Sequence, residues 1–137
     1  MNRKRQTPAY IYEHSGFVHT EYDIKCLLLY TLDQCNRWVN LTSITDITLG
    51  ADRGFTYFDM IDALTSLIKL GLVDNNESAG QYYRLSDKGA ELNEITRRDV
   101  EFTVRRAVRK LASRRYFEDI LLKNAPLPKE LENEVRR

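Results

Sequence analysis

The chain has 137 residues, a length typical of one domain, and 42% of them are hydrophobic while 30% are charged. Its 21 lysine and arginine residues nearly balance 20 aspartate and glutamate residues, which gives a formal net charge of +1. This composition argues against a histone-like or polybasic protein and against an acidic disordered chain.

The N-terminal segment, residues 1–20, shows few periodic apolar positions and is predicted to form an arm. Its basic residues 3–5 are not followed by the apolar stretch of a secretory signal. The longest apolar run, residues 26–30, is far shorter than the roughly 18 residues that span a bilayer. We therefore expect a cytoplasmic protein without a membrane partner.

The cysteine and histidine residues give little indication of a cofactor. Cys26 and Cys35 lie in one expected helix, roughly 13 Å apart along its axis, which is too far for a disulfide within one subunit. We expect free, buried or half-buried thiols. His14 and His19 could bind a metal with Cys26, but the sequence offers no fourth ligand, so no metal or other cofactor is expected.

The first half of the chain predicts three helices. Apolar residues recur at helical spacing over residues 23–35, and residues 38–41 form a connector that can pair as a short strand. A second helix over residues 42–49 is expected to be capped by Thr42 or Asn40 and ended by Gly50. Thr56 opens a third helix with a capping-box pattern to Asp59, and this helix runs to Lys69 before Gly71.

The second half predicts a hairpin followed by helices. Strands at residues 72–74 and 81–85 flank a turn at residues 75–80, and Ser86 caps a helix over residues 87–96. Residues 97–123 are helical again, with an apolar stripe from Val100 to Leu111 whose phase breaks near residues 113–115. The stripe packs either within the subunit or against a second copy. Residues after 124 are expected to be frayed.

This order predicts a mainly α protein with a small β-hairpin, an α+β fold of the winged helix-turn-helix type. The arm at residues 1–20 precedes the winged domain at residues 21–96, and a basic C-terminal helical extension follows at residues 97–137. Residues 70–73 and 83–89 resemble winged helices of the MarR and PadR type. Residues 16–110 also resemble a bacterial winged-helix family of unknown function, in the blocks 16–19, 23–30, 41–49, 57–59 and 83–89. This resemblance implies a transcriptional role.

In such a domain the third helix enters the DNA major groove and the hairpin reaches the adjacent backbone. The expected contacts on this helix and the turn before it are Arg53, Thr56, Tyr57, Asp59, Asp62, Thr65, Ser66 and Lys69. Those on the hairpin are Asn75, Asn76 and Arg84. Those of the basic segment are Arg97, Arg98, Arg105, Arg106, Arg109 and Lys110.

We therefore predict a transcriptional regulator that binds double-stranded DNA as a homodimer. The alternative is a winged-helix adaptor that binds protein and not DNA, because Asp59 and Asp62 on the reading helix repel phosphates. Residues 19–95 carry six basic and twelve acidic residues, whereas residues 96–137 carry twelve and seven. The basic segment either supplies DNA affinity or neutralises the acidic part across a dimer. No phosphate-binding loop or catalytic motif is present, so no enzyme is expected.

Overall fold

The structure is a computed structural model that describes residues 20–77 and 81–122. Of these residues 72% are helical, and a small three-stranded antiparallel sheet completes an α+β fold, as the sequence predicted. Residues 1–19 of the predicted arm, with His14 and His19, residues 78–80 of the predicted hairpin turn and the segment after residue 122 lie outside the described residues. The elements in chain order are α2 (Glu21–Cys35), β1 (Val39–Asn40), α3 (Leu41–Ala51), α4 (Tyr57–Lys69), β2 (Val73–Asn76), β3 (Tyr82–Leu85), α5 (Asp87–Thr96), the 3₁₀ turn η1 (Arg97–Asp99), α6 (Phe102–Tyr116) and the π-helical turn η2 (Phe117–Leu121).

The second helix differs from the prediction at both ends. Asn40, one of the two predicted caps, accepts the backbone N–H of Ser43 at 2.8 Å, so α3 begins at Leu41. The prediction that Gly50 ends the helix is wrong, because α3 continues through Gly50 to Ala51. A Cβ atom at residue 50 would lie 3.1 Å from Leu111 Cδ1 of α6. The glycine therefore leaves space for another helix and does not act as a helix stop.

Both predicted ends of α4 are confirmed. Thr56 accepts the N–H of Asp59, whose carboxylate accepts the N–H of Thr56 at 2.9 Å, so the capping box is complete. At the other end Gly71 adopts the left-handed conformation, with φ of 76°. The N–H of Gly71 then bonds to Ile68 and that of Leu72 to Leu67, which directs the chain from the helix into strand β2.

The sheet has the order β1-β3-β2, with β3 in the centre. The predicted strand before the second helix is present, because Val39 pairs with Tyr83. Asn75 and Asn76 were expected in the turn of the hairpin but belong to β2 instead, where they pair with Tyr83 and Tyr82. Backbone pairing along β3 therefore extends the hairpin by two residues beyond the predicted end of its first strand.

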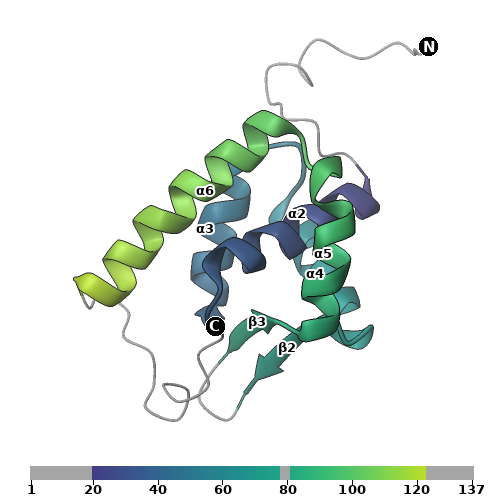
Figure 1. Ribbon diagram of the computed structural model, residues 1–137, viewed down its shortest axis with the longest axis horizontal. Coiled ribbons are helices and arrows are strands. Elements are labelled where there is room, and N and C mark those ends of the chain that lie inside the picture. The colour runs from purple at the N-terminus through teal and green to yellow at the C-terminus, as the bar shows by residue number, and fades with distance from the viewer. Residues whose placement is uncertain (1–19, 78–80, 123–137) are drawn as a thin grey trace.

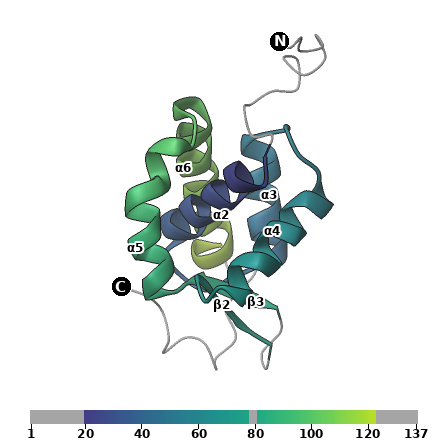
Figure 2. The ribbon, with the colours of Figure 1, turned by 90° about the vertical axis from the view of Figure 1, so that its right-hand side faces the viewer.

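Helix α2 lies at the centre of the fold and is buried almost all round (Figures 1 and 2). Helix α6 packs against α2 and α3 (Figure 1), and its residues Val104, Val108 and Ala112 belong to the same hydrophobic core as α2. Of the two arrangements left open by the sequence, the structure therefore shows the apolar stripe of α6 packed within the subunit.

Candidate nucleic-acid interface and an adjoining pocket

Helix α4 packs one face on the core and presents the other to solvent. Met60, Ala63, Leu64 and Leu67 are buried. Ser66 is half-buried, and the remaining candidate contacts on α4 and at its start are exposed: Thr56, Tyr57, Asp59, Asp62, Thr65 and Lys69. Arg53, in the turn before the helix, is exposed as well. A partner approaching this face therefore meets the side chains predicted from the sequence, together with Phe58, whose exposed fraction is 75%.

The carboxylate of Asp59 has a structural role at the start of α4, since it accepts the N–H of Thr56. We expect Asp59→Ala to lower the free energy of unfolding by about 1 kcal/mol, because the capping box loses one partner. Urea unfolding followed by circular dichroism measures this change. Asp62→Ala is the matched control on the same exposed face and should stay within about 0.5 kcal/mol of the wild type. Equal effects of the two changes would contradict this role for Asp59.

The hairpin places Arg84 beside the connector between α2 and α3. Its guanidinium carbon lies 4.5 Å from the centre of the Trp38 ring, and its Nε lies 3.6 Å from Asp74 Oδ2. Stacking on an aromatic ring limits the positions that an arginine samples. Asn75 is exposed and donates to Glu77 at 3.3 Å, while Asn76 is half-buried. The hairpin therefore presents one positioned guanidinium and two amides.

The basic residues of the C-terminal segment fall into two groups, and the first is held by the fold. Arg97 lies 3.8 Å from Glu94, and Arg109 donates to the hydroxyl of Tyr30 at 3.1 Å. Arg105 is half-buried and packs on the ring of Phe102. Removing these side chains would therefore disturb packing as well as charge.

The second group faces solvent. Arg106, Lys110 and Arg114 are exposed and spaced four residues apart along α6, and we call them the basic stripe. Among the residues that the structure describes, none offers the stripe a carboxylate partner within ion-pair distance. Like charges at this spacing repel one another on a helix. Arg98, in η1, is exposed too.

Helix α4 and the helix that carries the basic stripe lie on different sides of α2 (Figure 2). Helix α2 packs against both α4 and α6 and lies between them (Figure 2). The candidate contacts therefore form two regions. The first consists of α4, Arg53 and the hairpin, and the second is the basic stripe.

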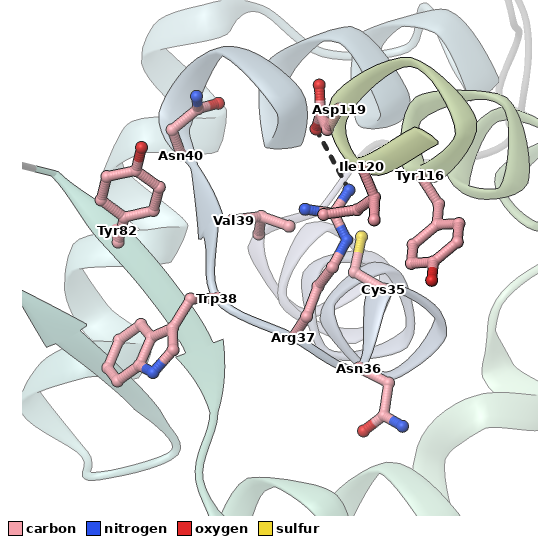
Figure 3. Close-up of a pocket in the computed structure, with 10 residues that line it drawn as sticks. All are labelled: Cys35, Asn36, Arg37, Trp38, Val39, Asn40, Tyr82, Tyr116, Asp119 and Ile120. Carbon is pink, nitrogen blue, oxygen red and sulfur yellow. Dashed lines mark hydrogen bonds and ion pairs between the residues drawn. The ribbon is translucent and has the colours of Figure 1, made fainter. Parts of the chain in front are cut away.

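A pocket that the sequence did not predict lies at the end of α2, where β1, β3 and η2 meet (Figure 3). It has a volume of about 330 Å³. Its walls are mainly apolar and are formed by Cys35, Asn36, Arg37, Trp38, Val39, Asn40, Tyr82, Tyr116, Asp119 and Ile120. Most pockets that bind small molecules have such walls with a few polar groups.

A buried ionic network forms one side of this pocket. Asp119 has an exposed fraction of only 3% and lies 3.1 Å from Arg37 Nη2, the contact drawn in Figure 3. Its Oδ2 also accepts from Ser43, and its Oδ1 lies 3.2 Å from Arg115 Nε. That Nε–H donates to Ser43 Oγ, while Arg115 Nη1 pairs with Asp46 at 3.0 Å. The network ties the end of α2 and helix α3 to the turn that follows α6.

The π-helical turn η2 explains why Asp119 reaches this position. The phase break expected near residues 113–115 falls two residues beyond that stretch, where α6 passes into η2 at Phe117. A π turn holds more residues than an α turn and changes the direction of the side chains beyond it. Here it directs Asp119 inward, while Phe117 and Leu121 are exposed.

The thiols of Cys26 and Cys35 are both free. Burial raises the pKa of Cys35, at the pocket, to about 11, and the nearby guanidinium of Arg37 only partly offsets this effect. Burial likewise raises the pKa of Cys26. Both groups are therefore thiols and not thiolates near neutral pH, which makes them poor nucleophiles and poor metal ligands.

Sequence reasoning missed Arg37 and Asp119 because they are 82 positions apart and neither lies in a motif. One indication was available. A single arginine at residue 37 stands directly before the apolar pair Trp38 and Val39, where a buried charge requires a partner. The identity of that partner could not be read from spacing.

These features define a small, mainly helical α+β domain whose arrangement is consistent with a winged helix. A family model described as Domain of unknown function (DUF4364) matches residues 24–121, and the chain belongs to this family. No curated protein and no solved structure matches the chain. Within residues 20–77 and 81–122, no helix is long and apolar enough to cross a membrane. The same ranges contain no group of three or more His, Cys, Asp or Glu side chains placed to hold a metal ion.

Proposed function

We propose that the protein is a winged helix-turn-helix protein that binds double-stranded DNA as a homodimer and regulates transcription. The observation that carries this proposal is the path of the chain around α4. The helix follows α3 after a short turn, presents a polar face to solvent, and leads through Gly71 directly into a two-stranded hairpin. A helix-turn-helix with its wing has this order.

The two candidate regions have different roles in this proposal. Helix α4 enters the major groove, where Thr65 and Lys69 contact DNA, while Arg53 and Arg84 neutralise flanking phosphates. Asp59 caps the helix and is not needed as a base contact. The basic stripe provides a second phosphate-binding region, which supplies affinity that the acidic face of α4 lacks.

Fluorescence anisotropy with labelled double-stranded genomic fragments, at two salt concentrations, tests this proposal. Each phosphate contact that is lost lowers the salt dependence, the slope of log K against log salt, by about 0.9. The triple change Arg106→Gln, Lys110→Gln and Arg114→Gln should therefore lower the slope by about 3 and weaken binding at every sequence. Arg53→Gln, at the exposed arginine in the turn before α4, should lower it by about 1.

The stripe is a better target than Arg105, which is half-buried, and Arg109, which donates to Tyr30. Arg106 also lies over the ring of Phe102, at 5.9 Å from its centre, but is exposed. Lys25→Gln is the control, since Lys25 lies on α2 and pairs with Glu21 at 3.0 Å. It should leave both affinity and slope unchanged. Failure of the unmodified protein to bind any fragment at low salt would overturn the proposal.

The exposed aromatic pair on α4 favours a second candidate, a protein adaptor. The rings of Phe58 and Tyr57 meet edge to face at 5.8 Å and are flanked by the carboxylates of Asp59 and Asp62. Exposed aromatic residues of this kind are common in protein interfaces. A pull-down that recovers one stoichiometric protein, resists nuclease treatment and fails with Phe58→Ser would favour this candidate. Loss of the captured protein on nuclease treatment would favour DNA binding.

A further inference from the structure

We infer that the pocket at the end of α2 binds a small organic anion, a carboxylate on a mainly apolar body. The carboxylate contacts the guanidinium of Arg37, and the apolar body lies against Trp38, Val39, Tyr116 and Ile120. This site adjoins the hairpin through Tyr82, and no residue of α4 or of the basic stripe lines it. It gives a role to an arginine that keeps unpaired N–H donors in the wall of a mainly apolar pocket.

The size and lining of the pocket fit such a molecule. A volume of about 330 Å³ lies at the lower end of the range typical of pockets for small ligands, roughly 300 to 1,000 Å³. In Figure 3 the side chain of Arg37 lies in the middle of the lining residues, with Val39 on one side and Cys35 and Tyr116 on the other. A ligand with one or two rings would fill this space and remove apolar surface from water.

The hydrogen bonding of Arg37 indicates the head group. Its side chain is only 10% exposed, and a guanidinium has five N–H donors. Nη2 donates to Asp119, and Nε is fully buried and out of reach of a ligand. Nη1 has no hydrogen-bond partner among the described residues and points toward Val39 in Figure 3, where a carboxylate would supply a charge-assisted hydrogen bond.

Asp119 does not exclude a second anion. Its carboxylate is already close to two guanidinium groups, those of Arg37 and Arg115, and it also accepts from Ser43. Arg115 is also paired with Asp46 and Glu118, so Asp119 is the carboxylate that compensates Arg37. The head group of the ligand is therefore held by the N–H donors of Arg37 that Asp119 leaves free, and not by an excess of positive charge.

The pocket is also connected to the hairpin. Trp38 and Tyr82 both line it, and Arg84 of β3 stacks on the Trp38 ring. A ligand against Trp38 would shift the position of Arg84 and so change DNA affinity. This last step rests on the proposed DNA-binding function, whereas binding of the anion does not.

Two matched probes test the site in the full chain. Trp38 is the only tryptophan, so its fluorescence reports on a bound probe. The anion 1-anilinonaphthalene-8-sulfonate and its neutral analogue N-phenyl-1-naphthylamine share one apolar body and differ in the sulfonate. We expect both to quench Trp38 saturably. Arg37→Met should weaken binding of the anion about tenfold, the loss of a charged hydrogen bond, and that of the neutral probe less than about twofold.

Leu121→Ser with Leu122→Ser is the control for binding elsewhere, because these exposed side chains follow α6 and do not line the pocket. It should leave both affinities unchanged. If Arg37→Met does not fold, Arg37→Lys is the substitute, because lysine keeps the charge but lacks the planar guanidinium group. It should weaken binding of the anion severalfold. The inference is overturned if neither probe quenches Trp38 or if the leucine variant abolishes binding. It is also overturned if the folded Arg37 variant weakens the binding of both probes equally, or of neither.

Adding the anion during an anisotropy titration with DNA tests the connection to the hairpin. A shift in DNA affinity that disappears in the folded Arg37 variant supports the connection. Quenching of Trp38 without any change in DNA affinity would disprove only the connection to the hairpin, and the inferred anion site would stand. Absence of DNA binding with normal quenching would contradict the proposed function and not the site.

Discussion

Replacing Gly89 with alanine is expected to lower the free energy of unfolding by about 3 kcal/mol, the upper end of the usual range for overpacking. A Cβ at residue 89 would lie 2.0 Å from the carbonyl oxygen of Leu72 and 2.9 Å from Leu85 Cδ1. The obstacle is backbone that cannot easily move, because the same carbonyl accepts the N–H of Ser86 at 3.1 Å. Ser86 Oγ in turn donates to Gly71 O at 2.7 Å.

Urea unfolding measured by circular dichroism checks this expectation, with Gly50→Ala as the matched control. A Cβ at residue 50 would meet only the end of the flexible Leu111 side chain, at 3.1 Å. Alanine is also favoured over glycine inside a helix by about 1 kcal/mol. Gly50→Ala should therefore stay within about 1 kcal/mol of the wild type. Equal unfolding midpoints for Gly89→Ala and the wild type would show that helix α5 can move away from β2.

Replacing Asp119 with asparagine is expected to lower the free energy of unfolding by about 3 kcal/mol. This change keeps the size of the side chain but removes the negative charge that the buried guanidinium of Arg37 faces at 3.1 Å. Breaking a buried ion pair on one side is strongly destabilising because an uncompensated charge remains inside the protein. Arg115 is affected less, since it retains its contact with the more exposed Asp46.

The same unfolding measurement includes two further variants. Asp46→Asn removes an exposed partner of Arg115 and should change stability by less than about 1 kcal/mol. The double change Arg37→Met and Asp119→Leu replaces both partners with apolar side chains and should recover at least about 1.5 kcal/mol relative to Asp119→Asn. If the double variant is less stable than the single one, packing around Asp119 and not its charge accounts for the loss.

The parts of the fold that were predicted correctly depend on local chemistry. The capping box of Thr56 and Asp59, the left-handed Gly71 and the cap at Ser86 each join residues within a few positions of one another. A hydroxyl residue before a helix usually caps it, and a glycine after a helix usually ends it, so a single sequence is enough to identify these roles.

The parts that could not be predicted depend on contacts distant in sequence. Gly50 has the local pattern of a helix stop, but Leu111 of another helix determines its role. The break in apolar spacing before Phe117 indicated a change in the helix, yet not that Asp119 would face Arg37. The pocket requires residues from five separate elements, α2, β1, β3, α6 and η2, so it becomes visible only once those elements are placed together.

The position of α6 in the core also has a consequence for synthesis of the protein. Val104, Val108 and Ala112 complete the packing around α2, which lies near the beginning of the described chain. Asp119, which neutralises Arg37, follows it by 82 positions and lies near the other end of the described chain. A nascent chain therefore keeps part of the surface of α2 uncovered, and Arg37 uncompensated, until α6 and η2 have left the ribosome. We expect its final cooperative folding to follow translation of these last elements.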